Sequence, residues 1–179
     1  MLNAVLFCRH GETESNRGGW LAGSRDVALT ARGRDQAEAA GRTLAAAGAP
    51  VPALYTSPQR RARETAAIIA GRLGCPVTVV PGLEERNWGE LEGHALPHDL
   101  LRPEVPGGES LADFHARVAA AFATLPSPAG GGPPLLVAHA GTWQALCRCL
   151  GLDPGHALPP NATPVLLERR AAGDHALGR

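Results

Sequence analysis

The stretch Ala4-Val5-Leu6-Phe7-Cys8-Arg9-His10-Gly11 decides the fold class of this chain. Five apolar residues in succession are typical of a strand that is covered on both faces. Gly11 breaks the run, so Arg9 and His10 fall at the carboxyl end of the predicted strand. Open α/β sheets place their ligand sites at this end of their strands. His10, flanked by an arginine, is therefore a candidate nucleophile in a site that handles phosphate.

Strands and helices alternate along the rest of the chain. We expect strands at 53–56, 77–80, 135–138 and 165–167, and helices from Thr30 to Ala47, from Pro58 with Ser57 as N-cap, from Glu109 to Leu125 and from Thr142 to Leu150. Such alternation favours a three-layer α/β sandwich, with a mostly parallel central sheet and helices on both faces. We expect residues 1–179 to form one domain, with a short irregular cap around 94–108.

Composition excludes several classes of protein. Lys plus Arg is 17 and Asp plus Glu is 17, so the net charge does not point to nucleic acid or an acidic membrane. No apolar run approaches the roughly 20 residues of a spanning helix, and neither HExxH nor a Walker-type loop occurs. The cysteines show no metal-ligand spacing; they are Cys8, Cys75, Cys147 and Cys149. We therefore expect reduced thiols, a cytoplasmic location and no metal.

Three of the predicted strands end next to a cation or an imidazole. Arg9 and His10 follow the first strand, Arg61 lies within a turn of the second, and His139 follows the fourth. In a parallel sheet these ends share one edge, beside the positive amino end of the helix that starts at Pro58. The planar fork of arginine matches phosphate oxygens, so the cluster favours a phosphate over a small carboxylate.

Each of these residues also has a structural explanation when it is taken alone. A lone histidine at a strand end is more often a hydrogen-bonded structural residue than a nucleophile. Arg60, Arg61 and Arg63 together are typical of a solvated helix face, and Glu84 and Glu85 of ordinary loop carboxylates. Their joint occurrence at matching strand ends favours the functional interpretation.

The sequence resembles the histidine phosphatase superfamily, which contains cofactor-dependent phosphoglycerate mutases and many small phosphatases. A single Arg-His-Gly is weak evidence, but ordered blocks through most of the chain are specific. The blocks are Arg9-His10-Gly11-Glu12-Thr13 with Asn16, Leu29-Thr30-Ala31-Arg32-Gly33, Ser57-Pro58-Gln59-Arg60-Arg61-Ala62, Leu83-Glu84-Glu85-Arg86-Asn87-Trp88-Gly89, Pro106-Gly107-Gly108-Glu109-Ser110 and His139-Ala140-Gly141.

The resemblance implies roles for individual residues. His10 is the implied nucleophile that forms a phosphohistidine. Arg9, Arg61 and His139 are implied to surround the phosphoryl group, with Asn16 hydrogen-bonded to it.

Two further implied positions lie in loops. Glu85, rather than Glu84, takes the place of the proton donor, and Gly23 is expected among the substrate-binding residues. The sequence departs from the family at Ala22, where many relatives carry glutamine, and at Ala140, where glycine is commoner.

Length favours hydrolysis over mutase activity. Only about twenty residues separate Glu85 from Pro106, and about a dozen follow the last predicted strand. The resemblance implies that glycolytic mutases of this family are longer chains, with a larger insertion and tail that shield the intermediate from water. We therefore expect a phosphatase that hydrolyses phosphomonoesters through a phosphohistidine, without a cofactor, acting on a small phosphorylated metabolite or a phosphoprotein. A phosphoglycerate mutase, a phosphohistidine phosphatase acting on protein and a non-catalytic phosphate-binding module remain alternatives, and the oligomeric state is open.

Overall fold

A five-stranded sheet in the order β3-β2-β4-β1-β5 forms the centre of the computed structural model, which describes residues 2–48, 51–128, 132–153 and 158–169. The strands are β1 (Ala4–Arg9), β2 (Leu54–Thr56), β3 (Val77–Val79), β4 (Leu135–Ala138) and β5 (Pro164–Glu168). The helices are α1 (Glu14–Gly18), α2 (Ala31–Ala46), α3 (Arg60–Leu73), α4 (Leu111–Ala123) and α5 (Ala140–Cys149), with a short 3₁₀ turn η1 (Gly89–Leu91). Strands β1 to β4 pair in parallel and β5 runs antiparallel to β1, which confirms the predicted fold class.

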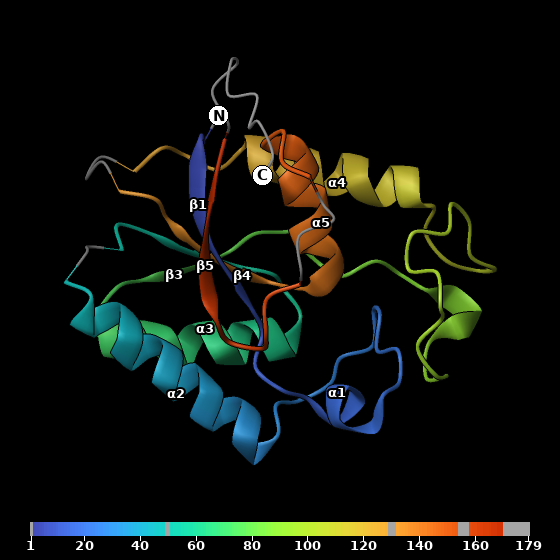
Figure 1. Cartoon of the computed structure of the whole chain (residues 1–179), viewed down its shortest axis with the longest axis horizontal. Coiled ribbons are helices and arrows are strands. Elements are labelled where there is room, and N and C mark those ends of the chain that lie inside the picture. Colours follow the sequence, from blue (N-terminus) through green and yellow to red (C-terminus); the bar gives the residue numbers. More distant parts are fainter. Residues whose placement is uncertain (1, 49–50, 129–131, 154–157, 170–179) are drawn as a thin grey trace, which may run out of the picture.

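Alternate residues of β1 face two different helix layers. Val5 and Phe7 pack in a core cluster that includes Phe114 of α4 and Trp143 of α5. Cys8 points to the other face, into a cluster built from α2 and α3. Figure 1 shows α2 and α3 side by side on one side of the strands and α4 and α5 on the other. The apolar run that opens the chain is therefore covered on both faces, as predicted, and burial raises the pKa of the Cys8 thiol to about 12.

Strand register brings the predicted site residues to one edge of the sheet. Arg9 of β1 lies opposite Ala138 of β4, and the next amide, that of His10, donates to the Ala138 carbonyl at 2.9 Å. On the other side of β4, the Ser57 amide donates to the Val137 carbonyl at 3.1 Å. The chain therefore leaves three neighbouring strands at the same level of the sheet.

The start of α3 differs from the prediction. The helix begins at Arg60 with Gln59 as N-cap, whereas Ser57 had been expected to cap a helix starting at Pro58. The Ser57 hydroxyl accepts from the Gln59 amide at 3.3 Å, as an N-cap side chain would, and also lies 2.7 Å from His139 Nε2 across the sheet.

A short helix, α1, lies inside the segment 11–28 that the sequence indicated only as a loop. Its N-cap Thr13 accepts a hydrogen bond from the Asn16 amide, and the Asn16 side chain accepts one from the Thr13 amide. This is a capping box with asparagine in place of the usual glutamate or glutamine.

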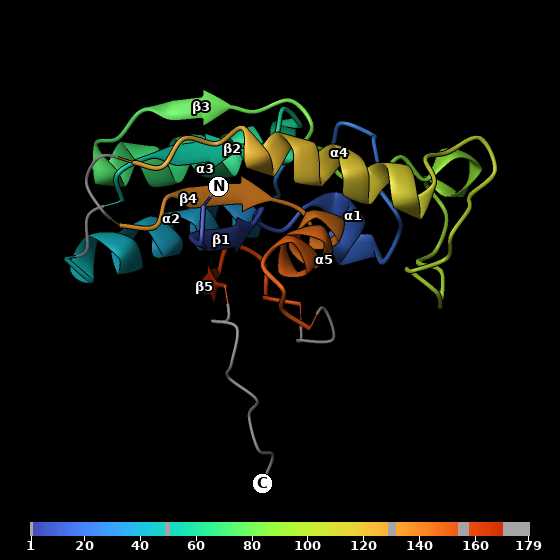
Figure 2. The same cartoon turned by 90° about the horizontal axis from the view of Figure 1, so that it is seen from above.

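Residues 94–108 contain no helix or strand, as predicted. They lie beyond the amino end of α4 in both Figure 1 and Figure 2, at one end of the molecule. Leu21, after α1, accepts a backbone hydrogen bond from Gly93 and donates one to His94, both at 2.8 Å, so the cap is attached to the loop that follows α1. We refer to residues 94–108 as the cap.

Two sequence-based interpretations fall partly outside the described residues. The predicted connector 126–134 is described only in part, and the tail beyond residue 169 lies outside the description. Within the described segments, no helix is both long enough and apolar enough to cross a bilayer.

Candidate active site

A cavity of about 330 Å³ opens at the carboxyl edge of the sheet, between α1, the cap and the start of α5. Six of the seven predicted site residues line it: Arg9, His10, Asn16, Gly23, Arg61 and Glu85. The seventh, His139, does not belong to the wall that the described residues form. The residues proposed from separate strand ends and loops are thus brought together in space.

His10 is held as a neutral imidazole. Its side chain is buried, and its Nδ1 lies 2.8 Å from the Gly11 carbonyl, which can only accept a hydrogen bond. Nδ1 therefore carries the proton and Nε2 keeps its lone pair. Burial, reinforced by the positive charges of Arg61 and Arg9, holds the pKa of His10 well below its usual range. The geometry thus provides a nucleophilic nitrogen at neutral pH.

His139 lies directly behind this histidine. The two ring centroids are 5.3 Å apart, and His139 Nε2 lies 2.7 Å from the Ser57 hydroxyl. Its Nδ1 is buried without a partner among the described residues. Burial, with Arg61 as the largest charge contribution, also holds the pKa of His139 well below its usual range.

Arg61 differs sharply from the other two arginines of its helix. Only 2% of its surface is exposed, whereas Arg60 and Arg63 are exposed, so the solvated-face explanation does not apply to Arg61. Its guanidinium donates to the carbonyls of Arg25 and Gly23, both at 2.8 Å, and to Gln59 Oε1 at 3.1 Å. These bonds fix its orientation where it lines the cavity.

Arg9 is the second cation of the cavity wall. Its Nε is buried and has no partner among the described residues. Burial lowers the pKa of its guanidinium, while the nearby Glu85 raises it. One buried and one partly buried guanidinium beside a neutral imidazole make a strong site for a dianion.

Glu85 is positioned by two backbone amides. Its Oε1 accepts from the Arg86 amide at 2.8 Å and its Oε2 from the Gly141 amide at 3.0 Å. A Cβ at position 141 would overlap Glu85 Oε1, so a glycine is required for this approach. Glu84 instead pairs with Arg117 at 3.3 Å and does not contribute to the described wall. Of the two acids, only Glu85 faces the cavity, which agrees with the choice made from the sequence.

Asn16 and Gly23 complete the predicted set. Asn16 Oδ1 accepts from the Thr13 amide and from Asn161 Nδ2, both at 3.2 Å, and from the Thr13 hydroxyl at 3.1 Å, so its side-chain amide nitrogen Nδ2 is the group that it can offer a ligand. Gly23 has a positive φ of 54°, and its carbonyl is one of the acceptors that orient Arg61.

Sequence reasoning missed Asn161. Its Nδ2 donates to the His10 carbonyl at 2.8 Å as well as to Asn16. Ala162, the next residue, has a φ of 49° and donates its amide to the Arg9 carbonyl at 2.8 Å. Because these partners lie about 150 residues away in the chain, no local pattern identifies them.

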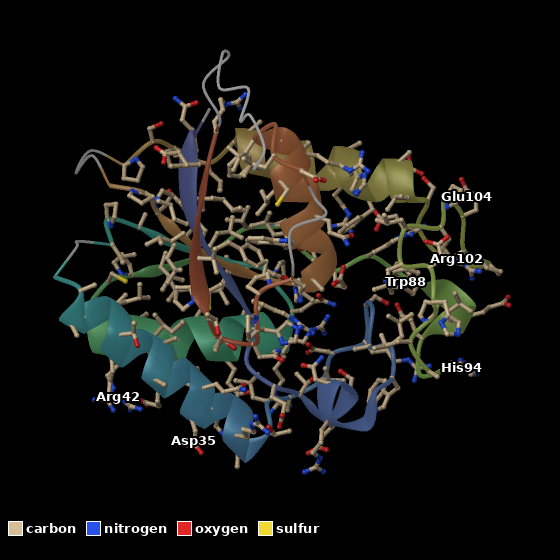
Figure 3. All side chains as sticks on the ribbon, viewed as in Figure 1. Asp35, Arg42, Trp88, His94, Arg102 and Glu104 are labelled. Carbon is tan, nitrogen blue, oxygen red and sulfur yellow. The ribbon has the colours of Figure 1, made fainter. Side chains whose placement is uncertain are left out.

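Arg86 is a buried cation to which the sequence assigned no role. Its Nε, Nη1 and Nη2 donate to the carbonyls of Glu109, Arg102 and Pro103 at 2.8, 2.9 and 3.1 Å. Its guanidinium also lies 4.7 Å from the centre of the Trp88 ring. Figure 3 shows Trp88 between the rest of the molecule and the labelled cap residues Arg102 and Glu104. Arg86 therefore fixes the cap to the wall of the cavity.

In chemical terms, the site combines a neutral nucleophile, two cations and a carboxylate around one cavity. This set can bind a phosphoryl group, stabilise charge on its oxygens and exchange a proton with a departing or attacking oxygen. Across the described residues, no group of three or more His, Cys, Asp or Glu side chains is placed to hold a metal ion.

Comparison with known families gives a match over nearly the whole chain. Residues 5–172 match the histidine phosphatase superfamily (branch 1). A 2,3-bisphosphoglycerate-dependent phosphoglycerate mutase of Beijerinckia indica is 34% identical over 172 residues, which cover 84% of this chain and 82% of the relative. A probable phosphoglycerate mutase GpmB of Yersinia enterocolitica is 33% identical over 169 residues, covering 86% of this chain and 77% of the relative.

Solved structures show the same architecture. The mycobacterial glucosyl-3-phosphoglycerate phosphatase Rv2419c, in a complex with VO3, superposes with a TM-score of 0.77 at 31% identity, covering 93% of this chain and 91% of the other. The protein TTHB049 from Thermus thermophilus gives a TM-score of 0.73 at 33% identity, with 92% of each chain covered. The similar proteins thus include both a phosphatase and proteins named as mutases.

Proposed function

The chain belongs to the histidine phosphatase superfamily, and we propose that it hydrolyses phosphomonoesters through a phosphohistidine formed on His10. The observation that carries this proposal is the hydrogen bond between His10 Nδ1 and the Gly11 carbonyl, which leaves Nε2 as a neutral nucleophile in a cavity lined by two arginines and a glutamate.

In the first step, Nε2 of His10 attacks phosphorus, and the bond between phosphorus and the ester oxygen breaks. Arg9 and Arg61 stabilise charge on the three equatorial oxygens. Glu85 gives its proton to the leaving oxygen, so the alcohol departs neutral and Glu85 becomes a carboxylate.

In the second step, Glu85 takes a proton from water as the water oxygen attacks phosphorus. The bond between phosphorus and Nε2 breaks, its electron pair returns to His10, and inorganic phosphate is released. Asn16 is proposed to donate to a phosphoryl oxygen, and His139 to support the charge from its position beside His10.

Mutase activity is the second candidate, because curated relatives at 33–34% identity are named phosphoglycerate mutases. A mutase has to keep water from its phosphoenzyme. The short cap favours hydrolysis instead. Interconversion of the two monophosphoglycerates, with the bisphosphate primer present, can be compared directly with phosphate release. A mutase rate well above the hydrolytic rate would reverse the order of the two candidates.

We also propose that the reaction needs no metal, because Arg9 and Arg61 already supply two positive charges at the phosphoryl group. Turnover of an aryl phosphate should be unchanged by a chelator. Loss of activity that a divalent ion restores would contradict this.

A cytoplasmic location is proposed because Cys8, Cys75, Cys147 and Cys149 are all free thiols. Cell fractionation would test it directly.

The decisive experiment identifies the intermediate. Rapid quenching with a labelled substrate should trap phosphate on the protein in a linkage that acid cleaves and alkali does not, as expected for an N–P bond. His10→Ala should abolish this label. A label of the same stability in His10→Ala, or an alkali-labile label in the unaltered protein, would show that another residue is the nucleophile.

A further inference from the structure

The wall of the cavity away from the arginines indicates what the phosphate is attached to. Building on the proposed phosphatase function, we infer that the substrates of this site are monoesters of compact apolar alcohols, aryl or alkyl. A second anionic group on the substrate would be disfavoured.

Apolar side chains form most of the wall that surrounds the organic part of a bound ester. The principal ones are Trp20, Trp88, Leu96, Leu100, Phe114 and Leu158. Phe114 and Trp88 are buried in the floor, whereas the three leucines stand at the mouth with 55%, 41% and 40% of their surface exposed. These leucines come from the cap and from the loop before β5. An apolar group passing between them would remove their surface from water.

The cations of the wall are largely engaged before a second anion could bind. Its arginines, among the described residues, are Arg9, Arg61 and Arg86. The first two are assigned to the phosphoryl group. Arg86 is almost fully buried, and each of its three nitrogens donates to a backbone carbonyl, which leaves one hydrogen on Nη1 and one on Nη2. A carboxylate or second phosphate would therefore lose its water and gain as its charged partner only this guanidinium, whose orientation is fixed by the carbonyls of residues 102, 103 and 109.

The neutral polar residues of the wall do not change this balance. Ser15 and Gln144 can each form hydrogen bonds with a hydroxyl or carbonyl of the substrate. Neither neutralises a charge. The wall thus accepts uncharged groups and selects against polyanions.

The volume of the cavity also limits the size of the alcohol part of the substrate. The cavity of about 330 Å³ lies at the small end of the roughly 300–1,000 Å³ that is usual for ligand sites. It has room for a phosphoryl group and one compact organic group.

A series of unbranched alkyl phosphates from ethyl to octyl isolates the contribution of apolar contact to catalysis. Their leaving groups have nearly the same basicity and differ only in apolar surface. Burial of a methylene is worth about a fourfold gain in binding when complete. We expect kcat/KM to rise about two- to fourfold per methylene until the chain passes the leucines at the mouth. Glycerol phosphate and 3-phosphoglycerate should fall at least tenfold below hexyl phosphate.

Alkylphosphonates of the same lengths provide a measure that does not depend on turnover. Their dissociation constants, measured by calorimetry, should fall with chain length in the same proportion. A flat series, or binding of 3-phosphoglycerate as tight as that of hexylphosphonate, would overturn the inference. Absence of turnover on every ester together with a length-dependent phosphonate series would instead count against the proposed function alone.

Adjacent leucines in the cap offer a matched pair of variants. Leu100 lines the cavity, while Leu101 is similarly exposed, at 45%, but does not line it. Leu100→Glu should reduce the preference for hexyl over ethyl phosphate by at least threefold, and Leu101→Glu should leave it unchanged. Equal effects of the two substitutions would show that the exposed leucines act through the stability of the cap and not through contact with the substrate.

Discussion

Replacing Gly141 by alanine tests the position of Glu85 without removing its carboxylate. Gly141 lies in the first turn of α5, and its amide donates to Glu85 Oε2 at 3.0 Å. A Cβ at this position would overlap Glu85 Oε1 and lie 3.0 Å from Cζ of Phe114. Because the Phe114 ring is buried and the glutamate is the more flexible of the two, the carboxylate should be displaced.

The expected loss follows from what a positioned acid contributes. General acid catalysis contributes about 10²–10⁴-fold, and a carboxylate that is shifted rather than deleted should lose about 10- to 100-fold of it. The loss should appear in kcat/KM for alkyl phosphates, whose leaving oxygen needs a proton. Aryl phosphates, with better leaving groups, should lose only a few-fold. Glu85→Gln should show the same pattern to a greater extent.

Gly71 of α3 supplies the control, since a Cβ there meets nothing within 4 Å. Gly71→Ala should leave both activities unchanged and stabilise the helix by about 0.5–1 kcal/mol, which is about 1–4 °C in Tm for a chain of this size. Gly141→Ala should gain less or lose stability, because its neighbours have to move. If Gly141→Ala reduces alkyl and aryl turnover equally, the assignment of Glu85 as proton donor is wrong.

Three further predictions concern the buried charges. Arg61→Ala should lower kcat by about 10²–10³-fold and destabilise the fold, because the Arg25 carbonyl loses its Arg61 donor, and the Gly23 carbonyl and Gln59 Oε1 each lose one of two donors, whereas Arg60→Ala should change neither; similar kinetics for the two variants would restore the solvated-face explanation. Burial holds the pKa of His10 and His139 below the 6.5 of an unfolded chain, so protons bind the unfolded chain first as the pH falls. Below about pH 6.5 the free energy of unfolding should therefore decrease by up to about 1.4 kcal/mol per pH unit for each histidine. Urea titrations from pH 7 to pH 5 check this, and His10→Ala should remove about half of the slope. Arg86→Met should destabilise the protein by about 2–4 kcal/mol and expose the cap to proteolysis, and unchanged proteolysis would show that the hydrogen bonds of Arg86 do not hold the cap.

The parts of the fold that the sequence predicted well are those in which local pattern and tertiary environment agree. Residues 4–8 and 135–138 are unbroken apolar runs, and β1 and β4 lie at the centre of the sheet with helices on both faces. Thr30 was expected to cap a helix, and its hydroxyl does accept from the Gly33 amide. The same hydroxyl donates to Glu12 Oε1 at 2.8 Å, and this distant contact leaves the local cap bond in place.

Ser57 makes one contact that its local sequence indicates and one that it does not. As a serine before a proline it has the local features of an N-cap, and its hydroxyl accepts from the Gln59 amide, but the same hydroxyl lies 2.7 Å from Nε2 of His139, 82 residues further along the chain. Arg61 and Arg60 are adjacent in sequence, and only the carbonyls of Gly23 and Arg25 distinguish the buried one from the exposed one. Its position near a strand end and the family resemblance both indicated Arg61, and the structure places it in the wall of the cavity; helix propensity alone does not distinguish it from Arg60.

Two physical arguments support the proposal of hydrolysis over mutase activity. From the sequence it depended on length alone, since a short cap shields an intermediate poorly. The structure adds the chemistry of the wall: Arg86 is the third cation beside the cavity, but each of its nitrogens donates to a backbone carbonyl, so its guanidinium is not free to turn toward the second charged group of a phosphoglycerate. Freeing that guanidinium would require the cap to release the carbonyls of Arg102 and Pro103. The residue that attaches the cap is thus also the one that a polyanionic substrate would need, and this chain uses it for structure.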